Sequence, residues 1–286
     1  MAAKKAKAEQ TPEEKKKARR KMWIIIGSAV LVFLLLEWLF IGYRFSFGPF
    51  KGLGDIRMSK MPGNAETYSV KSLSEIPNSP LKGKNVLFLG SSVTYGAASL
   101  QEGIPEYFGV RLGCKVTKEA VSGTTLVDDS GSSYVSRLLK NVDKNTPYSL
   151  VVVQLSTNDA TQKKPLGEIA SGTDKSAFDT HTVTGAMEYI IAYCKETWNC
   201  PVVFYTGSRY ESEPYAAMVE RLMELQDKWG IGVLDLWHDD AFNTLSDTDR
   251  ALYMYDNIHP TKAGYRDWWC PEMERQLLSY LNEVSK

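Results

Sequence analysis

The 286-residue sequence offers little with which to bind a metal ion or a nucleic acid. Its three histidines, four cysteines and carboxylates form no cluster with the spacing of metal ligands. Its 34 basic side chains are balanced by 34 acidic ones, so the overall basic surface of many nucleic-acid-binding proteins is absent. The sequence therefore predicts no metal or other cofactor and no nucleic-acid partner.

Cysteine pairs of the C-x-x-C type are also absent. Apolar neighbours favour buried thiols for all four cysteines, which are Cys114, Cys194, Cys200 and Cys270. Cys194 and Cys200 lie near the end of a predicted helix and the start of a predicted strand. A disulfide between these two stays open as an alternative if this part of the chain lies outside the cell.

Residues 90–96, GSSVTYG, follow an apolar run but lack the signatures of known phosphate-binding loops. No lysine follows Gly96, as a Walker loop would require, and the third glycine of a dinucleotide-binding loop is missing. The G-x-S-x-G elbow of another hydrolase class is absent as well. Taken alone, the segment is equally typical of a polar turn.

One long apolar run, MWIIIGSAVLVFLLLEWLFIGY, spans residues 22–43 and carries a single charge, Glu37. As a helix rising about 1.5 Å per residue, it is long enough to cross a hydrocarbon core of ~30 Å. Residues 1–22 hold nine basic and three acidic side chains, against 25 and 31 in the rest of the chain. By the positive-inside rule, residues 1–21 are predicted to be a cytoplasmic tail, and the chain after Tyr43 to lie outside the cell membrane.

Two other interpretations of this run are weaker. A cleaved signal peptide is usually shorter and followed by an Ala-x-Ala pattern, which is absent here. A buried core helix is weaker still, since Trp23 at one end and Trp38 with Tyr43 at the other suit the two headgroup interfaces. Glu37 lies close to the predicted interface, so we assign it no function.

Residues 44–82 contain four glycines and four prolines, which exclude a long helix or a central strand. We predict that this segment is a linker. Its apolar members, such as Ile56, Val70 and Leu73, indicate that part of it packs on the following domain.

From Asn85 onward, short apolar runs alternate with amphipathic helical stretches. The predicted strands are 86–89, 116–121, 150–155, 202–205 and 231–236, and the predicted helices are 103–112, 133–142, 185–198, 213–229 and 262–284. This alternation predicts one three-layer α/β domain over residues 83–286, with a parallel sheet covered on both faces. In such sheets, ligands bind beyond the carboxyl ends of the strands.

Four short segments at this edge carry candidate catalytic residues. Ser92 follows the first predicted strand, Gly123 the second and Asn158 the third. Asp256 and His259 stand in D-x-x-H spacing shortly before the last helix. Such a carboxylate can hold the histidine tautomer and stabilise the imidazolium that forms when the histidine takes a proton from a serine. Each segment alone is also typical of an ordinary turn.

Together, the four segments resemble the sequence blocks of the SGNH, or GDSL-type, hydrolase superfamily over about residues 83–284. The resemblance implies a flavodoxin-like sheet of five parallel strands in the order 2-1-3-4-5. It also implies Ser92 as the nucleophile, His259 as the base and Asp256 as the group that orients the base. The N–H groups of Ser92 and Gly123 and the side-chain amide of Asn158 would form the oxyanion hole.

Two positions depart from the family pattern. Ser91 stands where the family commonly has Asp in Gly-Asp-Ser, and Ser156 stands where Gly is usual in the third block. Neither departure removes a catalytic group. The adjacent serines leave a choice of nucleophile, and alignment to the first block selects Ser92.

The resemblance implies a serine esterase that hydrolyses acyl esters through an acyl-serine intermediate. A membrane-tethered domain that faces outward would meet glycans of the cell envelope, so we expect acetyl or another short acyl group on a carbohydrate to be the substrate. Four aromatic residues near the site offer stacking surfaces for a sugar, namely Tyr95, Tyr255, Trp268 and Trp269. Core packing is favoured over stacking for those that begin the C-terminal helix. Three alternatives stay open: an O-acyltransferase that uses the same triad, a non-catalytic glycan-binding envelope protein, and a lipase that acts on membrane lipid.

Overall fold

The computed structural model describes residues 11–45 and 48–284, which form two compact units that divide between Arg57 and Met58. The first unit is built on α1 (Pro12–Phe45), followed by the 3₁₀ turn η1 (Gly48–Phe50) and the start of α2 (Lys51–Ser59). Thr11 and Glu14 form a capping box at the start of α1. The part of the predicted tail from Pro12 onward therefore shares one continuous helix with the predicted span, and residues 1–10 of the tail lie outside the described residues.

The apolar side chains of α1 are exposed, as Leu31 illustrates at 70%. This helix is long and apolar enough to cross a membrane. A membrane would remove from water the exposed apolar surface that a soluble protein rarely carries.

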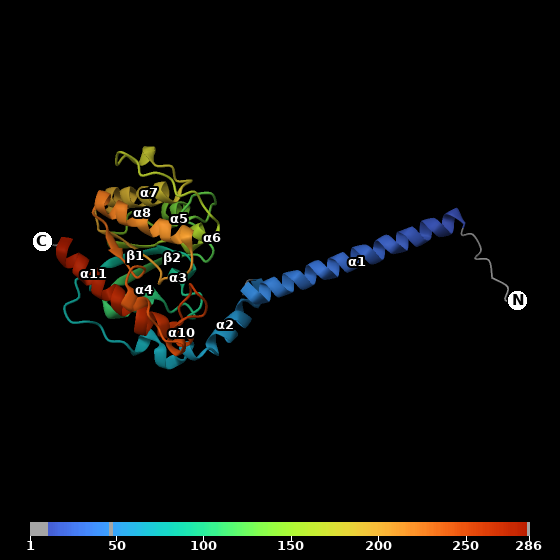
Figure 1. The fold of residues 1–286 in the computed structure, drawn as a ribbon, viewed down its shortest axis with the longest axis horizontal. Helices are drawn as coiled ribbons and strands as arrows, with labels where there is room; N and C mark the ends of the chain where they lie inside the picture. The colour runs from blue at the N-terminus through green and yellow to red at the C-terminus, as the bar shows by residue number, and fades with distance from the viewer. Residues whose placement is uncertain (1–10, 46–47, 285–286) are drawn as a thin grey trace. The chain divides into compact units, whose positions relative to one another are not determined.

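The second unit contains a sheet of five parallel strands in the order β2-β1-β3-β4-β5 (Figure 1). The strands are β1 (Asn85–Gly90), β2 (Lys115–Ala120), β3 (Tyr148–Gln154), β4 (Val202–Tyr205) and β5 (Gly232–Leu234). The predicted α/β class and strand order are confirmed. The fifth strand is shorter than the apolar run 231–236 that predicted it.

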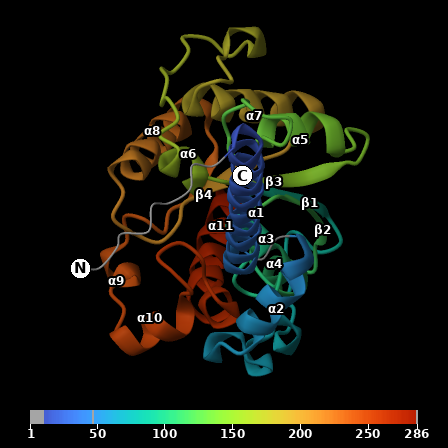
Figure 2. The ribbon, with the colours of Figure 1, turned by 90° about the vertical axis from the view of Figure 1, so that its right-hand side faces the viewer.

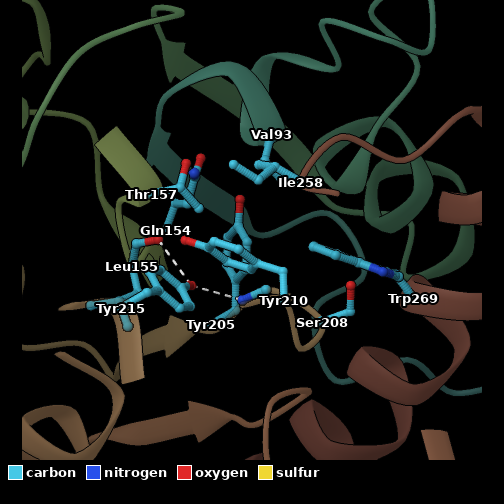
Figure 3. A pocket seen from close by; sticks show the side chains of 11 residues that line it. Val93, Gln154, Leu155, Thr157, Tyr205, Ser208, Tyr210, Tyr215, Ile258 and Trp269 are labelled. Carbon is cyan, nitrogen blue, oxygen red and sulfur yellow. Dashed lines mark hydrogen bonds between the residues drawn. The ribbon is translucent and has the colours of Figure 1, made fainter. Parts of the chain in front are cut away.

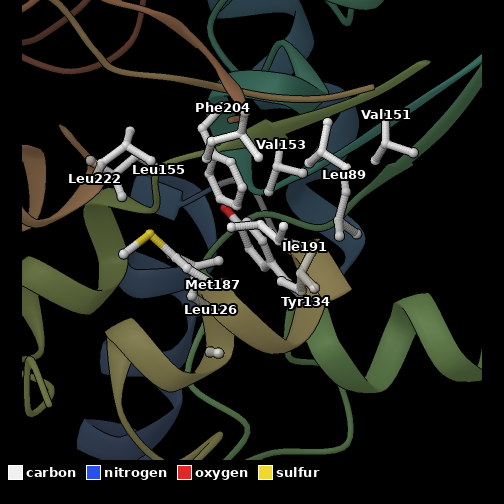
Figure 4. Close-up of a cluster of buried hydrophobic side chains, with 14 of the residues drawn as sticks. Leu89, Leu126, Tyr134, Val151, Val153, Leu155, Met187, Ile191, Phe204 and Leu222 are labelled. Atoms are coloured by element: carbon white, nitrogen blue, oxygen red, sulfur yellow. The ribbon is translucent and has the colours of Figure 1, made fainter. Parts of the chain in front are cut away.

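Helices cover both faces of the sheet, as Figures 1 and 2 show from two sides. One face packs against α5 (Tyr134–Asn141), α7 (Val183–Trp198) and α8 (Glu213–Trp229), and the other against α4 (Ile104–Arg111) and α11 (Cys270–Val284). Side chains alternate between these faces along each strand, so Leu87 and Leu89 enter the first core while Val86 and Phe88 enter the second. Figure 4 shows the first core, where Leu89 and Phe204 meet the helices.

Local chemistry explains where the long helices begin and end. Thr182 and Ser212 cap the first turns of α7 and α8 by accepting hydrogen bonds from Gly185 N–H and Tyr215 N–H. Both helices end at a residue in the left-handed conformation, Asn199 for α7 and Gly230 for α8.

The predicted C-terminal helix is helical over all of residues 262–284, but one turn of it is not α-helical. A π-helical turn, η6 (Gly264–Trp269), precedes α11. Gly264 approaches the chain so closely that an added Cβ would lie 2.1 Å from the carbonyl oxygen of Tyr253. The wide turn keeps Tyr265 and Trp269 on one face, and both are buried. The apolar spacing of the sequence does not reveal this π-helical turn, because apolar residues still recur every three or four positions through it.

Short helices occupy several segments for which no element was predicted. They are α3 (Ser92–Tyr95), α6 (Thr157–Thr161), α9 (Asp240–Asn243), α10 (Asp247–Tyr253) and the 3₁₀ turns η2 (Pro62–Asn64), η3 (Glu66–Tyr68), η4 (Val70–Ser72) and η5 (Lys175–Ala177). Elements this short lack a full period of apolar residues, so the sequence pattern does not reveal them.

All four cysteines are buried free thiols. Burial raises the pKa of Cys200 to about 11, and it raises the pKa of Cys194 well above the ordinary value. The alternative of a disulfide between these two is therefore not realised in the structure.

A buried carboxylate anchors the long connection between α6 and α7. Glu188 of α7 is fully buried; it accepts hydrogen bonds from Ala170 N–H, Lys228 Nζ and Trp229 Nε1. These contacts join the loop around Ala170 to α7 and α8.

We predict that Glu188→Ala lowers the free energy of unfolding by about 3 kcal/mol, because it leaves the Lys228 ammonium group without its buried counter-charge. Glu196→Ala on the same helix removes a more exposed pair with Lys175 and should cost less than about 1 kcal/mol. Urea unfolding of the full-length protein in detergent, followed by tryptophan fluorescence, measures both. Equal effects would contradict this account of Glu188.

Candidate active site

The turn after β1 holds Ser92 at the first position of α3. An added Cβ on Gly90 would lie 1.8 Å from Thr94 Oγ1, so this position has no room for a side chain. Gln154 Oε1 accepts hydrogen bonds from Ser91 N–H at 2.9 Å, Thr94 N–H at 3.1 Å and Thr94 Oγ1 at 2.8 Å. The end of β3 thereby fixes the turn that carries Ser92.

The loop before η6 brings a histidine to this serine. Met254 and Pro260 form an isolated antiparallel bridge that closes the loop. His259 Nε2 lies 2.7 Å from Ser92 Oγ, and His259 Nδ1 lies 2.9 Å from Asp256 Oδ2. A carboxylate can only accept, so Nδ1–H donates to Asp256, which leaves Nε2 to accept the Ser92 hydroxyl proton.

Asp256 is held by its own loop. Its Oδ1 accepts hydrogen bonds from Ile258 N–H and His259 N–H, both at 2.8 Å. Partial burial acts to raise the pKa of Asp256, but the hydrogen bonds from the His259 ring and these two N–H groups outweigh it and lower the pKa below its usual value. The carboxylate is therefore charged wherever it is needed to orient the imidazole.

The three groups predicted as oxyanion donors lie on turns that follow β1, β2 and β3. Gly123 has a φ of +82°, which favours glycine, and it follows β2 at the same edge of the sheet. Within the described residues, neither Ser92 N–H nor Gly123 N–H has a hydrogen-bond acceptor. Asn158, in the first turn of α6, donates from Nδ2 to the carbonyl oxygen of Thr124 at 3.0 Å. The amide of Asn158 thus lies next to the Gly123 turn.

A second buried carboxylate ties the Gly123 turn to α6. Asp159 is fully buried and accepts hydrogen bonds from Leu126 N–H at 2.8 Å and Val127 N–H at 3.1 Å. Burial raises the pKa of Asp159, although these bonds and one involving Ser156 oppose the rise. These hydrogen bonds hold the turn that carries Gly123 in a fixed position relative to the first turn of α6, which carries Asn158.

Arg137 of α5 crosslinks the ends of β1 and β2. Its guanidinium donates to the carbonyl oxygens of Gly90 and Glu119, each at 2.8 Å, and to Thr124 Oγ1 at 3.1 Å. The side chain is buried and paired with the Glu119 carboxylate. It therefore fixes the strand ends from which Ser92 and Gly123 follow.

Asn64, in the segment before the sheet, joins the two loops that carry Ser92 and His259. Its Nδ2 donates to the carbonyl oxygen of Ala98 at 2.8 Å, and its Oδ1 accepts from Lys262 N–H at 2.9 Å. Ala98 lies six residues after Ser92, and Lys262 lies three after His259. Asn64 is 3% exposed, so these hydrogen bonds do not compete with water.

A narrow pocket, with a volume of only about 10 Å³, lies beside the turn of Ser92 and the loop of His259 (Figure 3). Three of the residues that line it, Val93, Thr157 and Ile258, directly adjoin Ser92, Asn158 and His259 in the sequence. Its inner wall is formed by fully buried aromatic side chains, namely Tyr205, Tyr215 and Trp269. No group of three histidine, cysteine or carboxylate side chains suited to a metal ion occurs in the part of the chain that the structure describes.

The four aromatic residues considered near the site differ in their roles. Trp269 lines the narrow pocket. Trp268 stacks on Phe242 with ring centroids 4.8 Å apart and donates to its carbonyl oxygen, as a packing residue does. Tyr95 lies under the Lys118 ammonium group, and Tyr255 donates its backbone N–H to the carbonyl oxygen of His259.

The structure thus joins Ser92, His259 and Asp256 by hydrogen bonds and places Asn158 next to the Gly123 turn. It also shows four supporting residues that the sequence did not reveal. Gln154 and Arg137 left a faint signal, because each is a polar residue on an otherwise apolar strand or helix face. Asp159 follows a strand, where Asp is typical of an ordinary turn. Asn64 left no signal, since it lies among glycines and prolines in the predicted linker.

We predict that Asn64→Leu lowers the second-order rate at which Ser92 reacts with a fluorophosphonate by about tenfold, since the loops lose their shared hydrogen bonds. Asn141→Leu, an exposed change at the end of α5, should leave the rate unchanged. Inhibitor labelling of the full-length protein measures the rate, and a melting curve of each variant accompanies it. An unchanged rate for Asn64→Leu would show that this contact does not position the site.

The comparisons with known proteins agree with this geometry. The profile of the GDSL-like lipase/acylhydrolase family matches residues 88–266, more than half of the chain. A solved protein from Lactobacillus plantarum is 18% identical, with a TM-score of 0.54 over 71% of this chain and 98% of that one. A possible lipase from Chitinophaga pinensis DSM 2588 is 14% identical, with a TM-score of 0.51 over 70% of this chain and 98% of that one.

At these identities, the two solved structures support the fold alone. A search of the curated proteins found no significant match. The family match spans the segments that carry Ser92, Gly123, Asn158, Asp256 and His259. The chain therefore belongs to the GDSL-like lipase/acylhydrolase family, and it is an SGNH serine hydrolase that acts on ester bonds.

Proposed function

We propose that the protein hydrolyses acetyl or other short acyl esters carried on a carbohydrate, through an acyl-serine intermediate. The observation that carries the catalytic part is the continuous hydrogen-bond chain from Asp256 through His259 to Ser92, with links of 2.9 and 2.7 Å. A neutral serine hydroxyl is a poor nucleophile, and this chain supplies the base that activates it.

In the proposed reaction, Ser92 Oγ attacks the ester carbonyl carbon while its proton moves to His259 Nε2. Asp256 stabilises the resulting imidazolium. Collapse of the tetrahedral intermediate breaks the ester C–O bond, and His259 returns the proton to the departing alcohol. Water then attacks the acyl-serine by the same steps in reverse, which releases the carboxylic acid and restores the Ser92 hydroxyl.

The developing oxyanion requires donors that are already in place. Ser92 N–H and Gly123 N–H have no competing acceptor within the described residues, so both are available. Asn158 is proposed as the third donor. Its amide has a second N–H beyond the one that Thr124 occupies.

The size of the narrow pocket supports a short acyl group. The pocket begins at Val93 and Ile258 and ends at the buried rings of Tyr205, Tyr215 and Trp269. A long alkyl chain would require these packed side chains to move, which costs free energy in a close-packed interior. An acetyl group adds one methyl group beyond the carbonyl carbon, so it requires the least displacement of these side chains.

The N-terminal helix supports the carbohydrate part of the proposal. If α1 spans the membrane with its basic end in the cytoplasm, the catalytic unit lies outside the cell membrane. Esters on envelope or environmental glycans are then within its reach.

We predict that Asn158→Ala lowers kcat on p-nitrophenyl acetate by about 100- to 1000-fold, the usual cost of removing one oxyanion donor. Asn257→Ala, next to Asp256 but exposed, serves as the matched control and should keep the wild-type kcat. Steady-state kinetics of the full-length protein measures both values. A loss smaller than about tenfold would remove Asn158 from the oxyanion hole.

We predict that kcat/KM falls at least about tenfold from p-nitrophenyl acetate to the octanoate, because added methylenes must displace packed side chains. Ile258→Ala keeps the backbone N–H that holds Asp256 but enlarges the pocket, so it should reduce this preference. Efficient cleavage of long-chain esters by the unaltered protein, with no acetate released from acetylated glycans, would overturn the short-acyl carbohydrate assignment.

A further inference from the structure

A second cavity, which we call the polar cavity, lies beyond the carboxyl end of β4. It is open to solvent, has a volume of about 480 Å³ and is lined by Arg209, Tyr210 and Glu211 from the segment after β4, and by Asp240, Asn243 and Arg250 from α9 and α10. None of these residues belongs to the triad or to the proposed oxyanion hole.

The polar cavity adjoins the active site through one side chain. Tyr210 lines both this cavity and the narrow pocket, where Val93, Thr157 and Ile258 border the reacting groups. Figure 3 shows the Tyr210 ring within the narrow pocket. The centroid of the Tyr210 ring lies 5.2 Å from that of Tyr215 and 5.7 Å from that of Trp237, and these ring contacts hold Tyr210 in place. Tyr210 is therefore the side chain beside which a substrate that occupied both cavities would pass.

One wall of the polar cavity is preorganised. Arg209 donates from Nε to the carbonyl oxygen of Trp237 at 3.1 Å and from Nη1 to Asp240 at 2.6 Å. Asn243 Oδ1 accepts Arg209 N–H at 2.6 Å, and its Nδ2 is held by the carbonyl oxygens of Leu236 and Asp239, each at 2.7 Å. These contacts hold the wall without a ligand.

Two other charged groups in the cavity are unengaged. Arg250 of α10 and Glu211 form no ion pair and no side-chain hydrogen bond within the described residues. A guanidinium offers only donors and a carboxylate only acceptors. Their ligand should therefore carry groups that both donate and accept.

The charges also restrict the class of ligand. Arg209 and Arg250 are balanced by Asp240 and Glu211, so the lining has no net charge to attract a strongly anionic group. An alkyl chain would displace water from these charged groups and offer no hydrogen bonds in its place, which costs a large free energy of desolvation. The hydroxyl groups of a neutral sugar both donate and accept, and a tyrosine ring can lie against its apolar face.

We infer that the polar cavity binds the neutral sugar that carries the ester, with Arg250 and Glu211 as the residues that recognise its hydroxyl groups. This inference rests on the proposed function and names the part of the substrate that becomes the leaving alcohol.

The test compares two substrates of the full-length protein in detergent: partially acetylated neutral xylo- and manno-oligosaccharides, and p-nitrophenyl acetate, which has no sugar. Arg250→Gln and Glu211→Gln should each raise KM for the oligosaccharides about tenfold and leave kcat/KM for p-nitrophenyl acetate unchanged. Lys115→Gln removes an exposed charge at the amino end of β2, on the opposite edge of the sheet, and should change neither.

Two further outcomes are decisive. If both variants keep the wild-type KM for oligosaccharides that the protein deacetylates, the sugar-binding role of the polar cavity is wrong, while the esterase proposal stands. If the protein cleaves p-nitrophenyl acetate but no acetylated oligosaccharide, the carbohydrate proposal and this inference both fail. Deacetylated oligosaccharides give a readout without turnover: they should inhibit p-nitrophenyl acetate hydrolysis competitively, and less strongly in Arg250→Gln.

Discussion

The hydrogen bond between His259 and Ser92 joins two residues that are 167 positions apart in the chain, and the proposed chemistry depends on it. The parallel sheet makes this contact possible, because the carboxyl ends of all its strands lie at one edge. Asp256 completes the arrangement from within the same short loop as His259. Without this convergence, Ser92 would be an ordinary hydroxyl on a surface turn.

Buried polar contacts behind the site maintain that convergence. Gln154 fixes the Ser92 turn, Asp159 fixes the Gly123 turn to α6, and Arg137 joins the ends of β1 and β2. Asn64 connects the Ser92 and His259 loops from a segment outside the sheet. Each of these four side chains is buried, so removing one would leave its hydrogen-bond partners without water to replace it. The same buried hydrogen bonds hold the loops of the site in place.

Much of this could be predicted from the sequence, for identifiable reasons. Four of the five strands are mostly apolar, and the exception is the edge strand β2, which carries Lys115, Lys118 and Glu119. The family resemblance supplied the strand order and selected Ser92 over Ser91. The supporting contacts could not be predicted, because Asn64, Ala98 and Lys262 meet only after the fold has formed. The π-helical turn at Gly264 and the polar cavity depend likewise on close approaches between distant segments, which periodicity does not encode.

If the proposed chemistry is correct, Ser92 carries the acyl group during turnover. Rapid acid quenching of the full-length protein with excess p-nitrophenyl acetate, followed by peptide mass spectrometry, detects this directly. We expect the mass of one acetyl group on the peptide that contains Ser92, and we expect Ser92→Ala to eliminate both this adduct and acetate release. Acetate release at the wild-type rate by Ser92→Ala, or an acetyl group on a different catalytically competent residue, would contradict it.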